Sequence, residues 1–148
     1  MNAHPYVRAY MAGTIVPTLF LIVVLTGFVV VRLVLQFSEP VERIIIFPMA
    51  AVPNIWGLWN MLYVRVREGR NYSIGLHGAL LPFLLGPLGA VVGCLLGILT
   101  LAKSGATYFV VVHIHFGAVA AAFCIAVVIY YLAWKYFVNF FNGVVGIE

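Results

Sequence analysis

Residues 15–31 read IVPTLFLIVVLTGFVVV, an apolar run that carries no charge and shows no alternation of apolar and polar positions. A membrane-spanning β-strand needs such alternation, whereas a helix that crosses the hydrocarbon core needs about 20 mostly apolar residues in succession. The run, extended to Tyr10–Val31, therefore predicts a transmembrane helix. No small-residue cleavage site follows it, so we expect the helix to be retained rather than removed as a signal peptide.

Three further stretches meet the same length requirement, and they complete a predicted four-transmembrane-helix bundle: Ile44–Val64, Gly75–Leu101 and Tyr108–Trp134. The composition agrees, because only 8% of the 148 residues are charged and 65% are hydrophobic. A soluble domain carries about 25% charged residues. The prediction is one all-α integral membrane domain over residues 1–148, with residues 135–148 as a cytoplasmic tail at the membrane interface.

The basic residues flanking the predicted helices indicate the orientation. Five of them fall on the side shared by both termini and the second loop: Arg8, Arg65, Arg67, Arg70 and Lys135. The opposite side has Arg32, Arg43 and Lys103. Since cytoplasmic loops carry the excess of Lys and Arg, we expect both termini to be cytoplasmic in a bacterial-type inner membrane. A nucleic-acid partner is not expected, because these charges form no basic face with readers beside them.

Four glycines in the third predicted helix indicate close helix packing. Gly86 is followed by Gly89, Gly93 and Gly97, and the last three form overlapping GxxxG motifs. Small residues four apart let a second helix backbone approach closely within a bilayer. The partner helix is either in the same chain or in another copy, and we expect a homo-oligomer or a larger membrane complex in addition to the lipid bilayer.

The second predicted helix contains the segment AAVPNIWGLWN at residues 50–60, which is unusually rich in polar and bulky aromatic residues. At 1.5 Å of rise per residue, Asn54 falls at the bilayer midplane, and Pro87 falls at the same depth in the third helix. Helices interrupted near the midplane are where transporters build binding sites. Asn54 and Pro87 are therefore candidate ligand contacts, although Asn54 could equally serve the backbone loosened by Pro53. Trp56, Trp59 and Asn60, closer to the cytoplasm, are candidates as well.

Three histidines are further candidates. His77 opens the third predicted helix, roughly 16 Å from the midplane, where a helix-end hydrogen bond is the simplest role. His113 and His115 fall within the fourth predicted helix, and ionisable residues inside a span are functional hypotheses. On a continuous helix, two residues two positions apart point about 200° apart, so this pair is not expected to hold one metal ion or haem together.

No nucleophile–base or metal-ligand constellation stands out in the sequence, and no loop is long enough to form a separate domain. The leading hypothesis is a non-enzymatic subunit or scaffold that packs against other membrane proteins or lipid-like ligands. One alternative is an anchor subunit of a redox complex that contacts haem or quinone. A second is a small oligomeric transporter with its site near Asn54 and Pro87.

Overall fold

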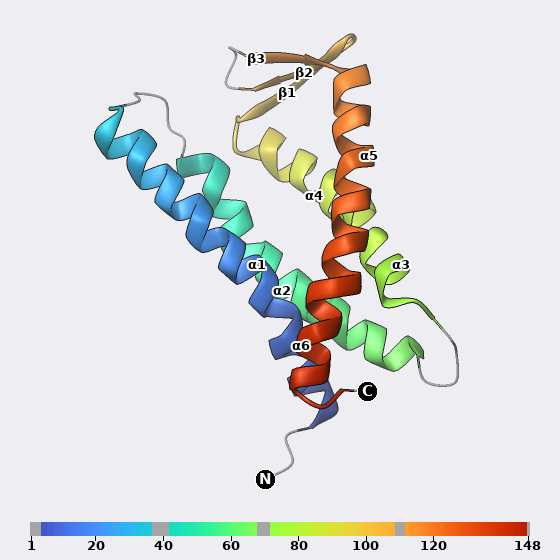
Figure 1. Ribbon diagram of the computed structural model, residues 1–148. Helices are drawn as coiled ribbons and strands as arrows, with labels where there is room; N and C mark the ends of the chain where they lie inside the picture. The colour runs from blue at the N-terminus through green and yellow to red at the C-terminus, as the bar shows by residue number, and fades with distance from the viewer. Residues whose placement is uncertain (1–3, 37–41, 68–71, 109–111, 148) are drawn as a thin grey trace.

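The computed structural model describes residues 4–36, 42–67, 72–108 and 112–147. Most of these residues are helical, and a small antiparallel sheet lies between the fourth and fifth α-helices (Figure 1). In chain order the elements are α1 (Pro5–Val29), the π-helical turn η1 (Val30–Val34), α2 (Glu42–Arg67), α3 (Ile74–Ala79), α4 (Leu81–Leu95), β1 (Leu99–Ala102), β2 (Gly105–Tyr108), β3 (Val112–His115), α5 (Phe116–Ala133), the π-helical turn η2 (Trp134–Val138) and α6 (Asn139–Val144).

Three helical segments in the described part of the chain are long and apolar enough to cross a membrane: Pro5–Val34, Ile74–Leu95 and Phe116–Val144. The prediction of a mostly helical chain is confirmed, and the three segments are compatible with a membrane protein. The helix α2, which covers the second of the four predicted transmembrane helices (Ile44–Val64), is not among these three. It nevertheless forms one helix of 26 residues through Pro48 and Pro53.

The predicted helix over Gly75–Leu101 ends earlier than expected, because Gly97 stops it. Gly97 has φ +68°, a left-handed conformation in which a side chain would be strained. The Ile98 amide donates to the Gly93 carbonyl oxygen at 2.9 Å, and the Gly97 amide donates to that of Cys94 at 3.1 Å. These two bonds form a Schellman motif, which satisfies carbonyl groups that the end of α4 leaves free. Gly97 is thus a helix terminator and not a helix-packing residue.

The sheet occupies residues 99–101, 108 and 112–115, which were expected to be helical. Its strand order is β1-β2-β3, and Ala102 pairs with Gly105 across a two-residue turn at Lys103 and Ser104. The three strands contain many β-branched and aromatic residues, which lose rotamer freedom in a helix and favour extended backbone. The all-α prediction is therefore wrong in this region.

The helices form two arms (Figure 1). Helices α1 and α2 lie side by side in one arm, and α5 lies beside α3 and α4 in the other. The arms meet close to the two termini, where η2 and α6 contact α1, and they diverge toward the sheet. The buried core includes residues from both arms: Ala9, Trp56, Tyr63, Val64, Ile74, Leu81, Trp134, Val138 and Ile147.

The C-terminal segment packs into the bundle, and its predicted place at the membrane interface stays a prediction. The helical path continues to Val144, and Val138, Asn142 and Ile147 are buried. The Arg8 Nη1 atom donates to the carbonyl oxygens of Val145 at 2.9 Å and Gly146 at 3.1 Å. A cation at a helix C-terminus interacts favourably with the helix dipole, so Arg8 joins the two ends of the chain.

Candidate functional site

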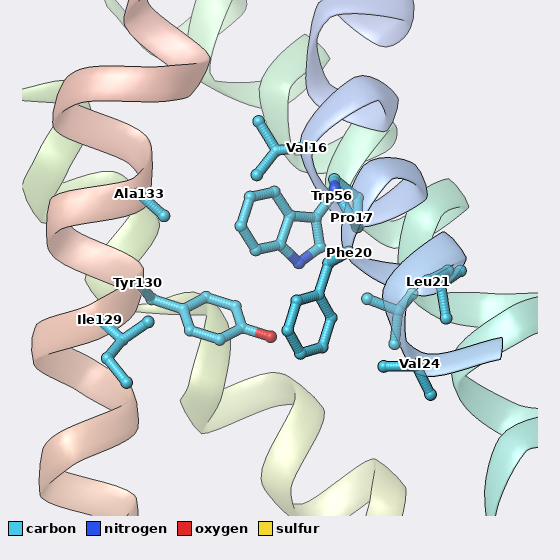
Figure 2. A pocket seen from close by; sticks show the side chains of 10 residues that line it. Val16, Pro17, Phe20, Leu21, Val24, Trp56, Ile129, Tyr130 and Ala133 are labelled. Carbon is cyan, nitrogen blue, oxygen red and sulfur yellow. The ribbon is translucent and has the colours of Figure 1, made fainter. Parts of the chain in front are cut away.

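A cavity of about 370 Å³ lies where the two arms diverge (Figure 2). We refer to it as the inter-arm cavity. Its volume is at the lower end of the range of roughly 300–1,000 Å³ that small-molecule sites occupy. Helices α1, α2 and α5 supply its almost entirely apolar lining: Val16, Pro17, Phe20, Leu21, Val24, Val52, Trp56, Ile129, Tyr130 and Ala133.

Trp56 is the most informative residue of this lining. Only 5% of it is exposed, and its indole Nε1 has no hydrogen-bond partner among the described residues. The Trp56 ring lies 5.1 Å from the ring of Tyr130 and 5.5 Å from that of Trp134, centroid to centroid. Figure 2 shows the Trp56 indole and the Tyr130 hydroxyl at the same part of the cavity. A buried donor without an acceptor destabilises a protein by about 1–3 kcal/mol, and a ligand oxygen would remove that penalty.

Trp59, a second candidate, serves the packing of α2 against α3. Its indole Nε1 donates to the His77 carbonyl oxygen at 2.9 Å, and His77 Nε2 donates to the Trp59 carbonyl oxygen at the same distance. Since a carbonyl oxygen only accepts, His77 Nε2 must carry a proton. The helix is interrupted at Leu80, between α3 and α4, and Pro82 follows within the first turn of α4. The Trp59 indole therefore satisfies a carbonyl group next to this interruption.

His77 lies in a box of aromatic rings and is only 4% exposed. Trp59 stacks on it at 4.9 Å, and Tyr63, Tyr72 and Trp134 lie at 5.4, 5.8 and 5.6 Å. It does not line the inter-arm cavity. These contacts make His77 a residue that joins α2, α3 and η2.

Asn60 is fully buried and pairs with Asn142, a residue that the sequence analysis did not single out. Asn60 Nδ2 donates to Asn142 Oδ1 at 2.7 Å, and Asn142 Nδ2 donates back to Asn60 Oδ1 at 3.2 Å. The second hydrogen of Asn60 Nδ2 is donated to the Ala9 carbonyl oxygen at 2.8 Å. One amide pair thus joins α1, α2 and α6. An asparagine within the apolar run YFVNFFNGVV was the available signal for Asn142.

Asn54 and Pro87 are not brought together. The Asn54 side chain is exposed; its Nδ2 donates to the Ala50 carbonyl oxygen at 2.9 Å, and its Oδ1 accepts from the Tyr10 hydroxyl. Asn54 therefore serves the backbone of α2 and its contact with α1. Pro87 is an exposed residue inside a continuous α4, so the expected interruption at mid-depth is absent there. Neither residue lines the inter-arm cavity.

His113 and His115 lie on β3, and the helical geometry expected for them is wrong. On a strand, residues two apart face the same side of the sheet, and the two rings are 5.1 Å apart. His113 Nδ1 is 3.0 Å from Thr107 Oγ1, and His113 Nε2 is 3.3 Å from Ser104 Oγ. Both histidines are exposed. Across the described ranges, no group of three or more potential metal-ligating residues comes together.

Gly86, Gly89 and Gly93 line a second cavity of about 510 Å³, between α4, α5 and the sheet. A Cβ atom at Gly86 would lie 3.3 Å from the Phe123 ring, and one at Gly93 would lie 3.2 Å from Leu99 Cβ. These two glycines therefore face other parts of the same chain. Self-association through the glycine face stays a prediction.

Comparison of the chain with family models, curated proteins and solved structures gives no match.

Proposed function

We propose that this protein is a non-enzymatic integral membrane protein that holds a lipid-like molecule in the inter-arm cavity and acts as a subunit or scaffold of a membrane complex. In this proposal the chain crosses a bacterial-type inner membrane four times, with both termini in the cytoplasm. The observation that carries the proposal is the inter-arm cavity itself, an almost wholly apolar space between three helices.

The four crossings are supported by the course of the chain. Both termini and the C-terminal end of α2 lie at one end of the molecule (Figure 1). A chain whose termini share one side must cross the membrane an even number of times, so three crossings do not suffice. At 1.5 Å of rise per residue, the 26 residues of α2 extend for roughly 39 Å. That length exceeds the hydrocarbon core of about 30 Å, and α2 lies along α1.

A lipid-like occupant is supported by the surroundings of the cavity. Phe20 and Ile129, which line it from opposite arms, are 66% and 56% exposed. Their exposed surfaces are apolar, as expected of helices that contact lipid tails. An apolar molecule dissolved in the bilayer could therefore enter from the lipid without crossing a polar barrier. Water has little to bind there, because Trp56 and Tyr130 bring the only polar side-chain groups of the lining.

The test is to identify molecules that remain bound to the purified protein and to fill the cavity by mutation. In Ala133→Phe, a large side chain replaces a small one in the lining. Ala121→Phe is the matched control, because Ala121 is exposed on the same helix and lines neither cavity described above. We expect native mass spectrometry to show a bound apolar molecule in the wild type and in Ala121→Phe, but not in Ala133→Phe. Equal retention by both variants, or a wild type that binds no apolar molecule, would contradict the proposal.

A further inference from the structure

We infer that the ligand of the inter-arm cavity carries a carbonyl oxygen at mid-depth in the bilayer, as the ring of an isoprenoid quinone does, and that Trp56 and Tyr130 bind this oxygen. The inference rests on the proposed function, because it assigns a chemical class to the lipid-like molecule proposed above. It concerns binding alone and includes no redox step.

The first argument is the unsatisfied donor on Trp56. An indole Nε1–H can only donate, and this one is buried with no acceptor at full hydrogen-bond geometry among the described residues; the Tyr130 hydroxyl is the polar group beside it. Of the ten lining side chains, eight are apolar, and Tyr130 is the only one besides Trp56 that has a polar atom. A hydrocarbon chain in the cavity would leave the indole with only the Tyr130 hydroxyl beside it, whereas a ligand with its own acceptor oxygen would give both donors a partner.

The second argument is the position of Tyr130 beside Trp56. Their ring centroids are 5.1 Å apart, and the Tyr130 hydroxyl points toward the space between α5 and α1 (Figure 2). A phenolic hydroxyl can donate a hydrogen bond as well as accept one. A carbonyl oxygen has two lone pairs, so it can accept from the indole and the phenol together. The aromatic faces of Phe20, Trp56 and Tyr130 also suit a flat ring.

The third argument is depth. Trp56 lies about 2 Å along the axis from the middle of α2, and the Tyr130 ring lies beside it. The ester carbonyls of a glycerolipid lie near the headgroups, about 15 Å from the centre of a 30 Å core. A glycerolipid would have to draw its ester groups deep into the hydrocarbon to reach Trp56. A quinone has an apolar tail and no charged headgroup, so its ring can reside at that depth.

The experiment compares two probes that share a tail and differ in the acceptor: a decyl-substituted benzoquinone and decylbenzene. The protein is held in nanodiscs of ether-linked phospholipid, which contain no ester carbonyls. Affinities come from titration followed by native mass spectrometry or by the shift of melting temperature. We expect the wild type to bind the benzoquinone roughly tenfold more tightly than decylbenzene, which corresponds to about one net hydrogen bond.

Trp56→Phe keeps an aromatic ring and removes the N–H. We expect this variant to bind the benzoquinone about tenfold more weakly than the wild type, with the affinity for decylbenzene unchanged. Tyr130→Phe removes the second donor, and it tests the inference even if Trp56→Phe fails to fold. Its control is Tyr136→Phe, because Tyr136 is an exposed tyrosine of η2. Equal wild-type affinity for both probes, or equal losses for both in Trp56→Phe, would overturn the inference and leave the proposed function standing.

Two further outcomes separate the remaining possibilities. If an ester-linked phospholipid displaces the benzoquinone as effectively as unlabelled benzoquinone does, the carbonyl belongs to a glycerolipid, and the assignment to a quinone is wrong. If neither probe binds the wild type and Ala133→Phe changes nothing, the proposed function itself fails.

Discussion

Replacing Asn142 by leucine tests how the buried amide pair holds the termini and α2 together. Leucine has a similar volume but makes no hydrogen bonds, so both amide–amide bonds are lost. Asn60 would keep its bond to the Ala9 carbonyl oxygen, but one of its N–H groups and its Oδ1 atom would lose their partner. A hydrogen bond between membrane helices contributes about 0.6 kcal/mol on average and up to about 1.7. We therefore expect Asn142→Leu to lower the free energy of unfolding by about 1–3 kcal/mol.

The measurement is reversible unfolding in mixed micelles, with the double-mutant cycle of Asn60→Leu and Asn142→Leu. The double variant has no orphaned amide, so it should lose less stability than the sum of the two single variants, by about 1–2 kcal/mol. Asn139→Leu is the matched control, because Asn139 is an exposed asparagine on the same helix, and its effect should stay within about 0.5 kcal/mol. A coupling energy below about 0.5 kcal/mol, or equal effects of Asn142→Leu and Asn139→Leu, would refute the role assigned to the pair.

Substitutions at three glycines test local features of the fold: Gly78 in α3, Gly27 in α1 and Gly97 after α4. A Cβ atom at Gly78 would overlap Trp134 Cγ, so Gly78→Ala should reduce the free energy of unfolding by about 3 kcal/mol or more. Gly27→Ala, with nothing within 4 Å of its added Cβ atom, should leave the melting temperature equal or higher. A tolerated Gly78→Ala would mean that α3 and η2 are not in close contact. Gly97 has φ +68°, so an alanine at this position would be strained. We expect Gly97→Ala to lower the free energy of unfolding by about 1 kcal/mol. An unchanged melting temperature in thermal unfolding would contradict this expectation.

The amino-acid sequence alone determined that the chain has helices long and apolar enough for a membrane, and roughly where they lie. Hydrophobicity summed over about 20 residues is a property of composition, so it needs no knowledge of neighbouring elements. The run at residues 15–31 is helical in the structure for this reason. The prediction of helix boundaries failed after α4, where a single residue, Gly97, ends the helix. Gly97 and the β-branched residues after it lie in one apolar stretch, so hydropathy does not show where the helix stops and the strand begins.

Only the tertiary structure decided which of the polar and aromatic residues act together. The pairs Asn60–Asn142 and Trp59–His77 join residues 82 and 18 positions apart, and no local pattern predicts such partners. The inter-arm cavity likewise draws its lining from α1, α2 and α5. Trp56 and Trp59 are three residues apart on one helix, yet one is satisfied by a neighbouring backbone and the other is left without an acceptor. That difference arises because a hydrogen bond depends on what the opposing helix places within about 3 Å, which is a property of the packed bundle.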